Sequence, residues 1–70
     1  MRPQFSKDSS EFISRGISFS KENNFKKAIS CFDKVLKIDA KSVVALLHKG
    51  LALRELGRNE EAIVCYDSVL

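Results

Sequence analysis

The stretch Lys26–Leu36, KKAISCFDKVL, decides the fold, because it returns further along the chain as Glu60–Leu70, EEAIVCYDSVL. The spacing from Lys26 to Glu60 is hereafter the repeat period. Six of the eleven paired positions are identical, and the aromatic Phe32 is matched by the aromatic Tyr66. The charged pair that opens the stretch changes from two lysines to two glutamates, whereas the apolar positions stay apolar. This difference indicates that the sequence is restricted mainly at the residues of a buried face. A period of roughly 20–50 residues is typical of proteins that stack one structural unit on the next.

The repeat extends upstream of that stretch to about Ser9. Gly16 is matched by Gly50, and Phe19 is matched by Leu53. The first copy is complete, whereas the second ends at Leu70 within its apolar pattern. Stable repeat proteins contain several units and polar caps. We therefore expect about two units that form a fragment of a longer array.

The composition is typical of a folded helical protein. Of the 70 residues, 44% are hydrophobic and 30% are charged, and the single Pro stands at position 3. Such a scarcity of helix breakers favours long helices. No apolar run approaches the roughly 20 residues of a membrane helix, and the N-terminus lacks the apolar core of a signal peptide. We therefore predict a cytoplasmic protein without a membrane segment.

Apolar residues at steps of three and four predict helices in four places. These helices are expected over residues 8–22, 25–38, 43–56 and from 59 to the end. Residues 1–7 show no helical period and are predicted to be a loose leader. The links between helices are short, so consecutive helices should pack antiparallel.

The residues at the predicted helix ends have the expected chemistry. Asp8 and Ser42 stand one repeat period apart and are predicted to be N-caps. Asn23 and Asn24 are expected to close one helix and cap the next, and Gly57 is expected to end the third helix.

The chain resembles the tetratricopeptide repeat family, whose 34-residue unit is a helix–turn–helix with a W-x-x-L-G-x-x-Y…A-x-x-x-F…P pattern. The first copy reads F-x-x-R-G-x-x-F from Phe12 and A-x-x-x-F from Ala28. The second reads L-x-x-K-G-x-x-L from Leu46 and A-x-x-x-Y from Ala62. The resemblance implies an all-α fold of antiparallel helix-turn-helix repeats stacked as an α-solenoid fragment, with four helices in about two units. The first unit would span residues 8–42 and the second, truncated, residues 43–70.

The small residues of this pattern predict close approach of the paired helices. Gly16 and Gly50 would let a neighbouring helix pass near the backbone. The aromatic residues Phe32 and Tyr66 are expected to fill the space between repeats.

In the resembled family, the first helix of each repeat lines a concave groove that takes an extended peptide or a partner's helix. Carried over by position, the partner-binding candidates are Ile13, Ile17, Ser20, Lys21, Leu47, Leu51 and Arg54. Co-chaperone members hold a C-terminal carboxylate with a Lys upstream of the Gly and an Asn directly after it. Apolar residues stand at those places here, so we expect a groove that prefers hydrophobic partner residues and not acidic C-terminal tails. The alternative is that Ile13, Ile17, Leu47 and Leu51 bury against a neighbouring helix.

These features predict a protein–protein interaction scaffold whose partner is an unidentified protein or peptide. Self-association through the uncapped C-terminal helix is a further expectation, because an open repeat edge needs a cover. The alternative function is a basic adaptor that contacts nucleic acid or an acidic surface through Lys26, Lys27, Lys34 and Lys37. The net charge is only +3 and acids interleave with the lysines, which disfavours nucleic acid.

Catalysis, a cofactor and a metal site are not indicated by the sequence. His48 is the only histidine and has no Asp or Cys at the spacing of a catalytic triad or metal site. Cys31 and Cys65 occupy equivalent places in two repeats, too far apart for a disulfide and too few for structural zinc. Asp33 and Asp67 are each expected to be solvated or paired with a nearby Lys. We therefore predict that the protein is not an enzyme.

Overall fold

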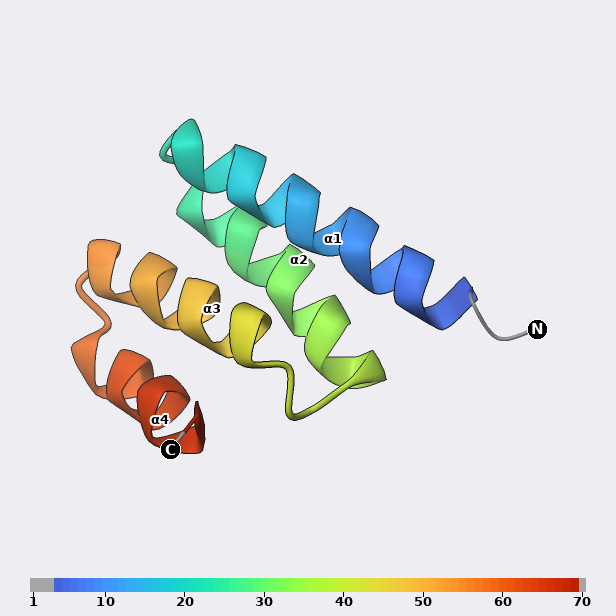
Figure 1. Ribbon diagram of the computed structural model, residues 1–70. Coiled ribbons are helices and arrows are strands. Elements are labelled where there is room, and N and C mark those ends of the chain that lie inside the picture. The colour runs from blue at the N-terminus through green and yellow to red at the C-terminus, as the bar shows by residue number, and fades with distance from the viewer. Residues whose placement is uncertain (1–3, 70) are drawn as a thin grey trace.

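The computed structural model describes the backbone of residues 4–69 and the side chains of residues 9–69. The described residues form four helices and no strand: α1 (Gln4–Lys21), α2 (Phe25–Ile38), α3 (Val43–Glu55) and α4 (Asn59–Val69). The helices α1 and α2 make one hairpin, α3 packs along α2, and α4 folds back beside α3 (Figure 1). The row measures 40 × 28 × 13 Å. The expected all-α fold of two stacked hairpins is confirmed.

The first helix begins earlier than the sequence pattern predicts. α1 starts at Gln4, so the prediction of a loose leader is wrong for residues 4–7, and Asp8 lies inside the helix instead of capping it. Residues 4–15 contain neither Gly nor Pro, so no breaker interrupts the helix upstream of Asp8. The remaining leader residues, 1–3, and the apolar Leu70 lie outside the described residues.

The two hairpins close with the same turn. Asn23 and Gly57, which are one repeat period apart, both have positive φ, at 63° and 82°. In each turn the next N–H bonds back to a helical carbonyl: Asn24 N donates to Phe19 O and Arg58 N donates to Leu53 O, both at 2.8 Å. This is the left-handed helix ending that Asn and Gly favour, and the predicted helix ends are confirmed.

The helix starts follow the expected caps in part. The side chain of Ser42 accepts a hydrogen bond from Ala45 N at 3.3 Å, which confirms the predicted N-cap of α3. Asn24 occupies the N-cap position of α2, but its side chain makes no capping hydrogen bond. The prediction that Asn24 caps α2 with its side chain is therefore wrong.

Glycine allows the helices of each hairpin to approach closely. A Cβ placed on Gly16 would lie 2.5 Å from Cε1 of Phe32, and one on Gly50 would lie 2.7 Å from Cε1 of Tyr66. The predicted close approach is confirmed. Each ring lies beside the glycine of its own hairpin and also reaches the other hairpin. Phe32 stacks on His48 at 5.5 Å between ring centroids, and Tyr66 packs against the cluster that contains Ile29 of α2. The expected filling of the space between repeats is confirmed.

The core has two connected parts that follow the row of helices. One gathers Ala28, Phe32, Val35 and Ala45, with Phe12, Ile13, Ile17, Phe19 and Leu36 packed against them. The other gathers Ile29, Ala52, Leu53, Ala62 and Cys65, with Phe25, Leu56 and Tyr66 packed against them. Because α2 and α3 contribute to both parts, the two hairpins share a continuous core.

Candidate functional site

An exposed apolar stripe runs along α3. It consists of four residues, hereafter the α3 stripe: Val43, Val44, Leu47 and Leu51, which are 49%, 45%, 40% and 44% exposed. Steps of three, four and seven place these side chains on one side of the helix. The opposite side of α3 holds the buried Ala45, Leu46, Ala52 and Leu53. α3 therefore has two apolar faces, of which one is buried and the other is exposed.

Two of the candidate residues on the first helix are half-buried. Ile13 and Ile17 pack against the core around Phe32, so they contribute to the fold as well as to the surface. Leu47 and Leu51 remain exposed. Burial against a neighbouring helix, the alternative considered for these four residues, thus applies in part to the pair on α1.

The polar candidates lie near the ends of α1 and α3. Ser20 is half-buried, whereas Lys21, at the end of α1, is exposed. Arg54, in the last turn of α3, is also exposed. Lys21 and Arg54 place positive charge at the C-terminal ends of α1 and α3, where a cation is electrostatically favourable.

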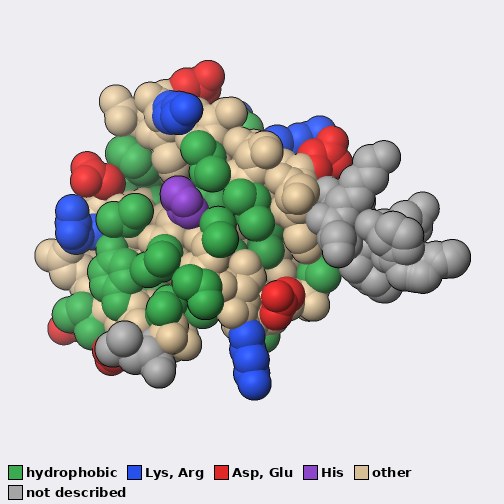
Figure 2. All heavy atoms as spheres, in the orientation of Figure 1, with side chains coloured by type: hydrophobic (Ala, Val, Ile, Leu, Met, Phe, Trp, Pro, Cys, Tyr) green, Lys and Arg blue, Asp and Glu red, His purple; other side chains and the backbone are tan. Residues whose placement is uncertain are grey.

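His48 lies within an apolar surface. It is half-buried, and its ring stacks on Phe32 with an interplanar angle of 24°. It follows Val44 by four residues and precedes Leu51 by three, so it lies next to the α3 stripe. Figure 2 shows the single histidine, in purple, surrounded by hydrophobic side chains. No acid contacts His48 to orient it for proton transfer among the interactions found in residues 9–69, and its position suits packing.

Two members of the α3 stripe were not among the residues expected from the sequence. Val43 and Val44 stand outside the family positions used for those expectations. Their spacing places them on the same face as Leu47, because Val43 precedes Leu47 by four residues and Val44 precedes it by three. It does not tell which apolar face of the helix is exposed.

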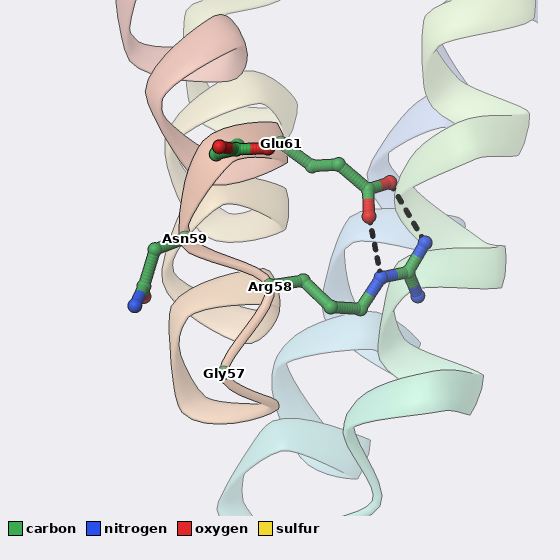
Figure 3. Close-up of a pocket in the computed structure, with 5 residues that line it drawn as sticks. Gly57, Arg58, Asn59 and Glu61 are labelled. Atoms are coloured by element: carbon green, nitrogen blue, oxygen red, sulfur yellow. Dashed lines mark hydrogen bonds and ion pairs between the residues drawn. The ribbon is translucent and has the colours of Figure 1, made fainter.

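A depression of about 320 Å³ lies at the turn before α4 and is lined by Gly57, Arg58, Asn59, Glu60 and Glu61. Figure 3 shows Arg58 and Glu61 joined side by side, with Nε donating to Oε2 and Nη2 donating to Oε1, each at 2.7 Å. The hydrogen bonds from Arg58 lower the pKa of the Glu61 carboxyl. These two charges satisfy each other at an exposed surface, and Glu60 also lines the depression.

A second, smaller depression of about 190 Å³ is lined by Lys49, Leu53, Glu61, Val64 and Cys65. Beside it, Lys49 Nζ lies 2.7 Å from Asp33 Oδ1 and joins α3 to α2. The expected pairing of Asp33 with a lysine is confirmed. Burial raises the pKa of the Cys65 thiol, which favours the protonated form of this side chain.

The four lysines that a basic adaptor would use are all exposed on α2: Lys26, Lys27, Lys34 and Lys37. Lys27 Nζ lies 5.7 Å from the Phe19 ring centroid and Lys34 Nζ lies 5.2 Å from that of Phe12, so two of the four contact α1. Within the described residues, no cluster of three His, Cys, Asp or Glu side chains could hold a metal ion.

The described part of the chain contains no helix that is long and apolar enough to cross a membrane. Cys31 and Cys65 are both free and buried.

Comparison with known proteins agrees with this architecture. The family model described as tetratricopeptide repeat matches residues 13–42 and again residues 43–70. No curated protein and no solved structure matches the chain significantly. Repeats of this family generally mediate protein–protein interactions and are not catalytic. Two tandem matches that together cover most of the sequence, on two hairpins that share one turn geometry, show that the chain belongs to the tetratricopeptide repeat family.

Proposed function

We propose that the protein is an interaction scaffold that binds a peptide or helix of a partner in the groove lined by α1 and α3. The observation that carries this proposal is the α3 stripe, whose four apolar side chains are 40–49% exposed. The half-buried Ile13 and Ile17 of α1 would form the other wall. A contiguous exposed apolar patch of this kind is a frequent mark of a protein-binding surface.

The proposed groove favours apolar partner residues over acidic tails. Ile13 and Leu47 stand three residues before Gly16 and Gly50, and Ile17 and Leu51 directly follow these glycines. None of these four side chains can bind a carboxylate. The cations Lys21 and Arg54 lie near the helix ends, where they would orient a partner more than anchor it.

A selection of peptides on the purified 70-residue chain tests the proposal. Helical or extended peptides from a random library should be enriched in Leu, Ile, Val and aromatic residues. Leu51→Lys should lower the affinity for the selected peptides by at least about tenfold, because a buried unpaired charge at the centre of an interface is costly. Leu51 is 44% exposed, so the variant should keep its helicity by circular dichroism.

Val64→Lys is the matched control, because Val64 is an exposed apolar residue on α4 and the substitution adds the same charge. It should leave peptide affinity unchanged. Equal affinity of Leu51→Lys and the unmodified chain would exclude the groove. Selection of acidic peptides whose binding collapses with salt would favour the basic adaptor that uses Lys26, Lys27, Lys34 and Lys37.

Self-association through α4 is the second candidate, and the exposure of Ile63 (55%) and Val64 (64%) favours it. Sedimentation across a range of concentrations tests it directly, since a strictly monomeric protein at high concentration would exclude it. A cytoplasmic location belongs to the same proposal and agrees with two buried free thiols.

A further inference from the structure

Packing explains one face of the His48 ring. That face stacks on Phe32 at 5.5 Å between ring centroids and with an interplanar angle of 24°. Phe32 is fully buried, and Gly16 lies so close to it that one added methyl group would overlap the ring. A side chain stacked on such a fixed ring has a narrow range of orientations. The imidazole is therefore held in place before any partner binds, which lowers the entropy that binding costs.

Packing does not explain the polar edge of the same ring. No hydrogen bond joins a nitrogen of His48 to any residue that the structure describes. Over the described side chains, the Tyr66 hydroxyl is the single buried polar atom that lacks a partner, so the nitrogens of His48 are not buried in this way. They remain open to water.

These open nitrogens lie beside the α3 stripe. Val44 stands one turn before His48 and is 45% exposed, and Leu51 stands one turn after it and is 44% exposed. Figure 2 shows the imidazole enclosed by hydrophobic side chains on this face. A partner that covers these apolar residues must therefore cover the imidazole too. The ring then loses its water, and a nitrogen that gains no new partner lowers the affinity.

We propose that His48 determines the specificity of the α1–α3 groove by requiring one hydrogen-bonding side chain in an otherwise apolar partner segment, an inference that rests on the proposed function. The segment carries an Asn, Gln, Ser or Thr with apolar residues on both sides of it. A neutral imidazole offers one N–H donor and one acceptor nitrogen, which an amide or a hydroxyl can satisfy. A site that must form such a bond rejects a purely apolar analogue more strongly than an apolar pocket rejects a change of size.

A carboxylate fits the same place less well. Arg54 lies nearly two helical turns after His48, and Lys49, the next residue, is paired with Asp33 at 2.7 Å. A partner carboxylate above the imidazole would be covered by the α3 stripe without a counter-charge from these two cations. Burying an unpaired charge costs more than burying an amide or a hydroxyl that is hydrogen-bonded. The neutral polar residues are therefore the expected choice.

Peptide selection on the purified 70-residue chain and on His48→Phe tests this specificity. The selection is made at about pH 8, where an ordinary histidine is neutral. Phenylalanine keeps a ring that can stack on Phe32 but has no nitrogen, so the variant should stay folded. The unmodified chain should select peptides with one amide or hydroxyl residue between apolar residues. His48→Phe should select purely apolar peptides.

One selected peptide and its apolar analogue then give a double-mutant cycle. Replacing the peptide's Asn by Leu, or its Thr by Val, should lower the affinity for the unmodified chain by at least about tenfold. The same replacement should not lower the affinity for His48→Phe. His48→Gln, which keeps a donor and an acceptor, should restore most of the preference for the polar peptide.

NMR gives a second, direct measurement. His48 is the only histidine of the chain, so the signals of its ring nitrogens can be assigned without ambiguity. The polar peptide should shift these signals more than its apolar analogue does. A merely structural role of the ring would give equal shifts with both peptides.

Ser30→Phe is the matched control, because it adds the same apolar ring at an exposed position of α2, outside the groove. It should leave the peptide preference unchanged. Purely apolar peptides that bind the unmodified chain as tightly as polar ones would overturn the role of His48 alone, and so would a preference for Asp or Glu at the central position. If no peptide is selected, or if Leu51→Lys has no effect on the selected peptides, the groove itself is overturned as well.

Discussion

Phe32 lies against Gly16 so closely that a methyl group on Gly16 would overlap its ring, 2.5 Å from Cε1. Phe32 is fully buried and cannot turn aside. We expect Gly16→Ala to lower the free energy of unfolding by about 1–2 kcal/mol, since overpacking costs about 1–3 kcal/mol and alanine returns up to about 1 kcal/mol of helix propensity. Urea unfolding measures the change.

Gly50→Ala is the matched comparison for that variant. Its added methyl would meet Tyr66 at 2.7 Å, but Tyr66 is partly exposed and can move. Its loss of stability should therefore be smaller than that of Gly16→Ala. Equal losses would show that the second hairpin is packed as tightly as the first.

The ion pair between Asp33 and Lys49 should couple the two hairpins weakly. The side chains are 48% and 26% exposed, so a double-mutant cycle with Asp33→Asn and Lys49→Met should give a coupling energy of about 0.5 kcal/mol. Added salt should reduce it. The pair of Glu11 and Arg15, at 3.6 Å and with both side chains more exposed, is the control and should give almost no coupling. A larger value for the control would contradict the role assigned to burial.

The Tyr66 hydroxyl is buried and has no hydrogen-bond partner among the described residues. Tyr66→Phe removes an unsatisfied polar group and should raise stability by up to about 1 kcal/mol. The reciprocal change, Phe32→Tyr, should destabilise by about 1–3 kcal/mol because it buries a hydroxyl at a fully buried position. Thermal unfolding of the two variants measures both changes in stability. A destabilised Tyr66→Phe variant would show that the hydroxyl has a hydrogen-bond partner in solution.

The hydrogen bonds between Arg58 and Glu61 should make the free energy of unfolding depend slightly on pH, in a direction that can be stated. Arg58 lowers the pKa of Glu61 in the folded chain. A carboxyl with a lowered folded pKa stabilises the fold above its unfolded pKa, and this contribution is lost as the pH falls through the folded value. Glu61→Gln should therefore lose less stability than the unmodified chain between about pH 5 and pH 3.

Thermal unfolding at several pH values checks this prediction. Glu60→Gln is the matched control, because it removes a neighbouring carboxylate that does not bond to Arg58. Parallel pH curves for the unmodified chain and Glu61→Gln would contradict the predicted contribution of Glu61.

The sequence predicted the helices where apolar periodicity and turn chemistry agree. The bounds of α2 were predicted at both ends, because Asn23 and Asp39 flank a strongly periodic segment. The start of α1 was missed because residues 4–7 carry no apolar period, and a helix can continue through such residues when no Gly or Pro stops it. Periodicity therefore identified the buried faces better than the ends.

The candidate groove was predicted only in part. Helical spacing identifies an apolar face but not which of two apolar faces a neighbour covers. On α3 that choice depends on α2, so the exposure of Val43 and Val44 became clear only from the fold. The pairing of Asp33 with Lys49 likewise depends on how two helices are rotated against each other, which a single sequence does not reveal.

The two outer faces of the helix row differ in polarity, and this makes the protein a directional building block. The exposed residues of α1 opposite the core include Glu11, Ser14, Arg15 and Ser18, whereas α4 exposes Ile63 and Val64. A designer who grafts further helical hairpins onto the protein should attach them beyond α4, where they would bury apolar surface. The same graft ahead of α1 would have to desolvate a glutamate and an arginine.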